Sequence, residues 1–72
     1  LESTVLVLED NRTLSVGDTL YGVLSKSKAK IKNVSSDRIY FDYETKTNNF
    51  YKREVLFNLK NGEFYKVKNV YS

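Results

Sequence analysis

Residues 28–44 constrain the fold more than any other segment, because apolar and charged residues alternate on both sides of a short polar break. Alternation with a period of two is typical of a β-strand that buries one face. With Ser35, Ser36 and Asp37 as the loop, the two halves can pair as antiparallel strands. The segment is therefore predicted to form a β-hairpin.

The register of this hairpin follows from the residues that must share a face. Pairing Ile31 with Phe41 gathers the apolar side chains on one side. The residues predicted to turn into the core are Ala29, Ile31, Ile39, Phe41 and Tyr43. On the other side Lys30 then faces Asp42, an ion pair of a kind that contributes roughly 0.2 to 1 kcal/mol.

The segment 4–9 is the clearest single strand, since it is apolar and β-branched. It ends at Asp10 and Asn11, two residues that favour turns. A two-residue loop at this pair predicts a second hairpin, in which Glu9 faces Arg12. In this arrangement the first strand pairs with the residues that directly follow the loop.

Glycine and polar residues mark the connections between the other strands. Gly17 and Asp18 predict a tight turn into a strand over residues 19–24. Gly22 lies inside that strand, where a glycine usually permits a bulge or a bend. Residues 45–49 contain no apolar side chain and are predicted to form an exposed loop.

Asn61 and Gly62 are the strongest turn signal in the chain, because both tolerate the positive φ of a type I′ hairpin. This turn predicts that a long strand over residues 50–60 pairs with the residues that follow, with Lys60 facing Glu63. Apolar residues then occur on both sides of the hairpin. The group predicted to lie in the core is Val55, Phe57, Leu59 and Phe64, with Leu56, Tyr65 and Val67 on the opposite side.

Residues 1–72 are predicted to form one all-β domain, since no segment has a sustained 3.6-residue period and a chain of this length builds one small core. The Val-Gly-Asp turn at 16–18, followed by an apolar strand, a basic hairpin and a further hairpin, resembles the layout of SH3-like barrels of the KOW and Tudor kind. The resemblance covers most of the chain as an order of strands. It implies a small antiparallel SH3-like barrel of about five to seven short strands. Modules of this kind commonly bind nucleic acid or peptides.

Three segments also resemble the opening half of a Hint domain, the fold of inteins and hedgehog autoprocessing. They are Ser-Thr-Val-Leu-Val-Leu-Glu-Asp-Asn at 3–11, the Val-Gly-Asp turn, and Val-Leu-Phe-Asn-Leu-Lys-Asn-Gly at 55–62. Ser3 takes the position of that family's nucleophile, but Lys68 and Tyr71 occupy the approximate places of its Thr-x-x-His sequence. Because the chain has no histidine to protonate a departing amine, the resemblance implies a related fold reused for binding.

The composition limits the chemistry that the chain can perform. Cysteine and histidine are both absent, which removes disulfides, thiolate and imidazole metal ligands, and the commonest general base. No phosphate-binding glycine loop and no metal-ligand spacing appears. No apolar run approaches the ~20 residues that span a bilayer. We therefore expect a soluble, cytoplasmic protein that is not an enzyme and that uses no cofactor, metal or membrane. Abundant Asn, Lys and Tyr suggest an A/T-rich genome, such as that of a bacteriophage or a low-GC bacterium.

Cations and tyrosines interleave in the last third of the chain. Residues 46–72 carry six Lys and Arg residues against two Glu, in a chain of net charge +3. Tyrosine can stack on a nucleic-acid base while Lys or Arg contacts a phosphate. The predicted nucleic-acid-binding residues are Tyr51, Lys52, Arg53, Tyr65, Lys66, Lys68 and Lys32.

These signals also have a plainer interpretation. The lysines at 28, 30 and 32 are about 7 Å apart along one strand face, near the phosphate spacing of nucleic acid. Asp42 and Glu44 across the hairpin nevertheless favour an ion-paired face in contact with solvent. Tyrosine beside a basic residue is ordinary strand composition as well. The alternative prediction is a protein–protein interaction or assembly module, with the oligomeric state left open.

Overall fold

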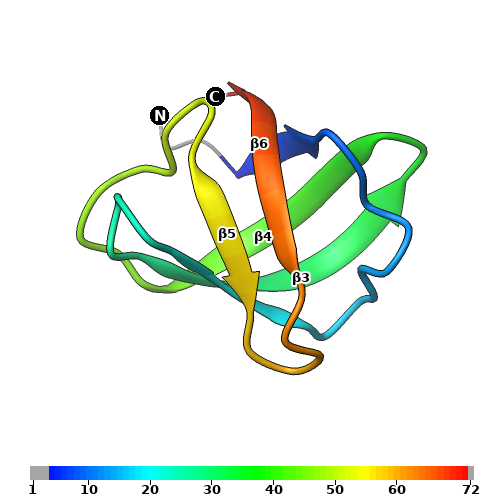
Figure 1. Ribbon diagram of the computed structural model, residues 1–72, viewed down its shortest axis with the longest axis horizontal. Helices are drawn as coiled ribbons and strands as arrows, with labels where there is room; N and C mark the ends of the chain where they lie inside the picture. Colours follow the sequence, from blue (N-terminus) through cyan, green and yellow to red (C-terminus); the bar gives the residue numbers. More distant parts are fainter. Residues whose placement is uncertain (1–3, 72) are drawn as a thin grey trace.

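The alternating segments of the sequence form six antiparallel strands that close into a small barrel (Figure 1). The structure is a computed structural model that describes residues 4–71, and these residues contain no helix. The strands are β1 (Val5–Leu8), β2 (Thr19–Gly22), β3 (Lys28–Ser35), β4 (Arg38–Thr45), β5 (Val55–Asn58) and β6 (Phe64–Tyr71). Around the barrel they follow the order β1-β4-β3-β2-β5-β6. The all-β prediction is confirmed, and the architecture is consistent with an SH3-like barrel at the level of the fold.

The hairpin predicted over residues 28–44 forms as β3 and β4. Ile31 pairs with Phe41 as predicted, but beyond Ile31 the register shifts and Ser35 pairs with Arg38. The loop therefore has two residues rather than three, with Ser36 at a φ of 57°. A two-residue turn with positive φ matches the twist of paired strands, and the irregularity around Lys32 absorbs the extra residue.

The inward face of this hairpin supplies much of the core. Ala29, Ile31, Ile39 and Phe41 are fully or almost fully buried, and Tyr43 is half-buried against them. The Phe41 ring lies 5.1 Å from that of Tyr43 and 5.3 Å from that of Phe50, measured between centroids. The predicted inward face is thus confirmed at all five positions, and Phe50 extends it from outside the hairpin.

The hairpin predicted at Asp10 and Asn11 is wrong. β1 lies between β4 and β6, pairing Leu6 with Ile39 on one side and with Val70 on the other. Leu6, Val7 and Leu8 are all buried, so this strand is apolar on both faces, and its backbone is paired along both edges. Arg12 forms its ion pair with Asp10, at 2.7 Å, rather than with Glu9.

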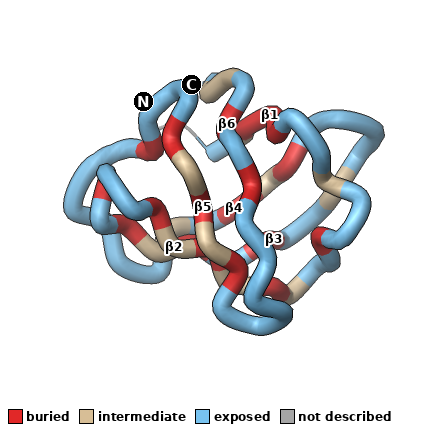
Figure 2. Tube along the Cα trace, in the orientation of Figure 1, coloured by how far each residue is buried: buried red, intermediate tan, exposed pale blue. Residues whose placement is uncertain are grey.

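The last hairpin forms with the opposite face inward. Leu56 pairs with Tyr65, and both are buried, as is Val67. Phe64, predicted to lie in the core, is 64% exposed, and Leu59 is exposed too. Val55 and Phe57, the other two residues of the predicted core group, are half-buried. Figure 2 shows buried segments alternating with half-buried or exposed ones along β5 and β6.

Polar residues at the two ends of β5 explain why the opposite face of this hairpin turns inward. The strand is only Val55–Asn58, and Glu54 and Asn58 share the inward side with Leu56 and are fully buried. The Asn58 side-chain oxygen accepts hydrogen bonds from the backbone N–H groups of Lys60 and Asn61, at 2.8 and 3.3 Å. The turn therefore begins after Asn58, and Phe57 pairs with Phe64 instead of with Lys66.

Candidate functional site

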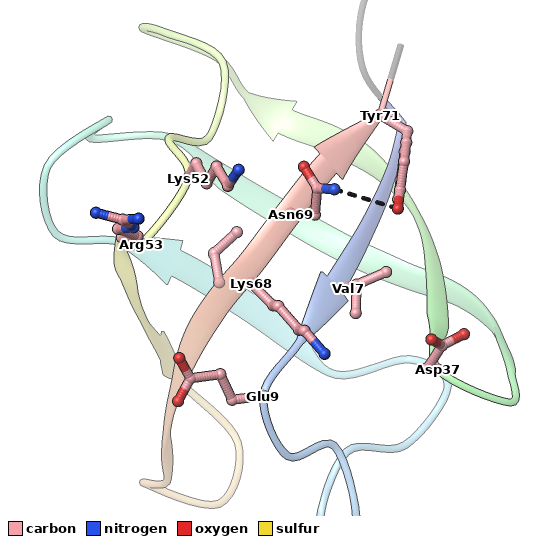
Figure 3. A pocket seen from close by; sticks show the side chains of 9 residues that line it. Val7, Glu9, Asp37, Lys52, Arg53, Lys68, Asn69 and Tyr71 are labelled. Atoms are coloured by element: carbon pink, nitrogen blue, oxygen red, sulfur yellow. Dashed lines mark hydrogen bonds between the residues drawn. The ribbon is translucent and has the colours of Figure 1, made fainter.

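Three of the predicted cations gather around a hollow of about 450 Å³ on the outside of the barrel. Val7 of β1 is buried beneath it, and the β6 backbone at Val67, whose side chain belongs to the core, also lines it. The charged residues that line it are Lys52, Arg53, Lys68, Glu9 and Asp37. Figure 3 shows Lys52 and Arg53 on one side of β6 and Asp37 on the other, with Lys68 between them.

A tight turn over residues 51–54 presents Lys52 and Arg53 to this hollow. The N–H of Glu54 donates to the carbonyl of Tyr51 at 3.1 Å, which closes the turn. Arg53 has a φ of 69°, a conformation that residues other than glycine adopt uncommonly. Its N–H donates to the carbonyl of Val67 at 2.9 Å, which ties the turn to β6. The two cations are therefore held on backbone that is fixed at both ends.

Glu54 holds the same turn from inside the barrel. One carboxyl oxygen, Oε2, accepts from the N–H of Tyr51 at 3.0 Å. The other, Oε1, accepts from the N–H groups of Leu24 and Ser25 at 2.7 and 2.6 Å. A Cβ atom at Gly22 would lie 2.6 Å from Oε1, so a larger residue there would displace this carboxyl group. Gly22 thus permits close approach of a side chain, which the sequence alone did not indicate.

The seven predicted site residues separate into four groups, of which Tyr65 alone is the last. Lys52, Arg53 and Lys68 line the hollow, while Tyr51 and Lys66 are exposed outside its lining. Lys32 lies on another face, where its Nζ is 3.2 Å from Oδ1 of Asp42, although the sequence pairs Asp42 with Lys30. The structure therefore brings three of the seven predicted residues together.

Tyr65 is the predicted residue that the structure places inside the barrel. It is 4% exposed, so neither face of its ring is open to a base. Its hydroxyl group is 2.9 Å from the hydroxyl of Thr13 and accepts from the side-chain amides of Asn58 and Asn61, each at 3.2 Å. Asn58 also donates to the buried carboxyl group of Asp18 at 2.9 Å. Tyr65 therefore connects a buried and half-buried polar cluster drawn from distant parts of the chain.

Tyr71, which lines the hollow, and Arg38, which stacks on the Tyr71 ring, were not predicted as site residues. The guanidinium of Arg38 lies 4.7 Å from the ring centroid of Tyr71, and this stacking carries an electrostatic attraction between cation and ring. The side-chain amide of Asn69 donates to the Tyr71 hydroxyl at 3.2 Å, which orients the ring (Figure 3). Arg38 and Tyr71 are 33 positions apart and meet because β1 lies between their strands. No local sequence pattern signals such a pair.

Within residues 4–71, no three carboxylate, histidine or cysteine side chains come together in a group that could hold a metal ion. No helix in the same range is long and apolar enough to cross a membrane. Ser3, which aligns with the Hint nucleophile, lies outside the described residues.

Comparison with known proteins supplies no relative. No protein-family model, no curated protein and no solved structure matches this chain. The geometry and charge of the hollow are therefore the observations that bear on function.

Proposed function

We propose that the chain is a non-catalytic module that binds nucleic acid through the basic hollow, with Lys52, Arg53 and Lys68 contacting phosphate groups. The observation that carries the proposal is the convergence of these three cations, from a turn and from β6, on one concave surface. Lysine and arginine contacts to phosphates release condensed counterions, and this release drives sequence-independent binding. The backbone that holds the turn reduces the entropy lost when a ligand binds.

Neighbouring side chains bear on this proposal in two ways. Arg38 and the Tyr71 ring lie at the β1 and β4 side of the hollow and add a cation and an aromatic surface. Glu9 and Asp37 also line the hollow and repel a polyanion. We therefore expect phosphates to occupy the side nearest Lys52 and Arg53, and we expect binding that is moderate in affinity.

We further propose that the barrel is an SH3-like module of the KOW or Tudor kind. A closed antiparallel barrel is compatible with the SH3-like modules of the KOW and Tudor kind, which commonly bind nucleic acid or peptides. No position of this chain is matched to a residue that contacts a ligand in those families. The Hint resemblance adds no activity to the proposal, because the sequence contains no histidine to take the place of that family's acid.

A second candidate function is binding to another protein. The observation that favours it is a pair of exposed apolar residues, Val23 and Leu24, on the connection between β2 and β3. Exposed apolar side chains that lie together are typical of interaction surfaces. Such binding would depend on these side chains and would be insensitive to the cations of the hollow.

A fluorescence-polarisation titration separates the two candidates. The labelled probes are a random duplex and a random single strand, each at a low and at a physiological salt concentration. We expect binding that weakens steeply with salt, and we expect Lys52→Ala, Arg53→Ala and Lys68→Ala each to reduce the slope of log K against log salt by about 1. Lys32→Ala is the matched control, because it removes the same charge from another face.

Two results would overturn the proposal. The first is the absence of binding to either probe at low salt. The second is an effect of Lys32→Ala equal to that of the three variants in the hollow, since this would show an attraction to net charge without a site.

A further inference from the structure

Three aromatic side chains form a row across the outside of the barrel. Tyr21 of β2 pairs with Phe57 of β5, and Phe57 pairs with Phe64 of β6. Directly paired residues project from the same face of a sheet. Their chain neighbours Leu56 and Tyr65 are buried, so the three rings project outward. The Phe57 and Phe64 centroids are 4.9 Å apart, and Phe64 is the most exposed of the three. We call Tyr21, Phe57 and Phe64 the aromatic row.

Lysines lie at both ends of this row. Lys28 of β3 pairs with Tyr21 at one end. Lys66 follows Phe64 by two residues on β6, so both side chains project outward from the same strand. Glu63 precedes Phe64, and Glu44 lines the same surface as Lys28, so the cations are partly balanced. A polyanion complements the lysines that lie at both ends of the row.

The aromatic row is also continuous with the basic hollow. Phe64, Lys66 and Lys68 are alternate residues of β6 and all three are exposed. Four residues of a strand span about 13 Å, which is the separation of Phe64 from Lys68 along β6. Lys68 lines the hollow. One extended ligand that lies along β6 can therefore reach both the rings and the cations.

We infer that the nucleic acid recognised by this module is single-stranded, with bases stacking on the aromatic row and phosphates contacting Lys66 and Lys68. This inference depends on the proposed function. In a duplex the faces of the bases are covered by their neighbours, whereas a single strand can offer a base to an aromatic ring. Sheet surfaces that carry aromatic residues on adjacent strands provide such stacking without sequence preference.

The test is Phe64→Ala, measured by fluorescence polarisation with a single strand and a duplex of the same length and label. Because stacking on one ring changes affinity by about 5- to 150-fold, we expect a loss in that range for the single strand and less than a twofold change for the duplex. Leu24→Ala is the matched control, since Leu24 and Phe64 are both 64% exposed. Both variants retain the core, so circular dichroism should show unchanged folds.

Each outcome has a distinct meaning. If the unmodified chain binds neither probe, the proposed function and this inference are both wrong. The unmodified chain could bind with salt dependence while Phe64→Ala leaves the affinity for both probes unchanged or lowers both affinities equally. In that case only the inference is wrong. A dimer in sedimentation that Phe64→Ala dissociates would also overturn it, because the row would then be covered by a second copy.

Discussion

The β3–β4 and β5–β6 hairpins differ in the kind of residue that they bury. In β3 and β4 the apolar residues turn inward and the charged residues meet solvent, as at Ile31 and Lys32. In β5 and β6 the inward side includes Glu54 and Asn58, while Phe64 lies outside. Both hairpins are antiparallel and both pack on the same core. The difference therefore comes from hydrogen bonding and not from the amount of apolar sequence.

The second hairpin shows when a polar residue can lie inside. Burying a polar group is costly unless it gains hydrogen-bond partners. Glu54 and Asn58 gain backbone and side-chain partners from segments far away in the chain, such as Leu24 and Asp18. Within residues 4–71, every buried side-chain nitrogen or oxygen atom has a partner. Inward polar residues are thus stable here because the barrel brings their partners to them.

The largest effect should distinguish the phenylalanines of the two hairpins. Phe41→Ala leaves a cavity in the core and should lower the free energy of unfolding by about 3 to 5 kcal/mol. Phe64→Ala removes an exposed ring and should cost less than about 1 kcal/mol. Urea denaturation followed by circular dichroism measures both. Equal losses would mean that Phe64 is buried and that the observed face of β5 and β6 is reversed.

Glu54→Gln tests the buried carboxyl group with little change in shape. Both carboxyl oxygens of Glu54 accept hydrogen bonds from backbone N–H groups. Glutamine would replace one of these oxygens with an NH₂ group, which donates and cannot accept, so a backbone N–H on that side would lose its acceptor. We expect a loss of about 2 to 3 kcal/mol in the free energy of unfolding. Asp42→Asn in the other hairpin is the control, because its exposed ion pair with Lys32 should contribute less than about 1 kcal/mol. A stability loss no larger than that of the control would contradict a structural role for Glu54.

Tyr65→Phe should have a smaller effect, since it keeps the buried ring and removes only the hydroxyl. The side-chain amides of Asn58 and Asn61 would each lose an acceptor. We expect a loss of about 1 to 2 kcal/mol on thermal or urea unfolding. Tyr51→Phe changes an exposed hydroxyl and should be close to neutral. A measurable weakening of nucleic-acid binding by Tyr65→Phe at unchanged stability would restore Tyr65 as a contact residue.

The smallest effect concerns the connection between β1 and β2, outside both hairpins. Hydrogen bonds from the Arg12 side chain lower the pKa of Asp10 from its ordinary value of 3.8 to about 2. Because the folded pKa is lowered, the contribution to stability is complete above pH 3.8 and is lost as the pH falls through about 2. NMR titration of the Asp10 carboxyl carbon measures this pKa. Arg12→Gln should return it toward 3.8, and an unchanged midpoint would mean that Arg12 is not its partner.

The amino-acid sequence by itself determined the fold class and the first hairpin. Alternation through residues 28–44 has one apolar side and one charged side, so only one face of that hairpin can turn inward. The interleaving of cations and tyrosines in residues 46–72 also indicated Lys52, Arg53 and Lys68, although the pattern placed Lys52 and Arg53 on a strand over residues 50–60 and the structure places them in a turn. In the first hairpin the deciding residues are near neighbours in the chain.

The tertiary structure decided which face of β5 and β6 is buried and which strands flank β1. It also decided that Tyr65 is buried whereas Tyr51 is exposed. In β5 and β6 both faces carry apolar residues, so periodicity alone does not choose between them. The choice depends on partners that are distant in sequence, such as Leu24 for Glu54 and Asp18 for Asn58. Closing the barrel brings those partners together. It also forms the hollow, because the residues that line it come from β1, β6 and two turns. A pattern of neighbouring residues carries no information about contacts that exist only after closure.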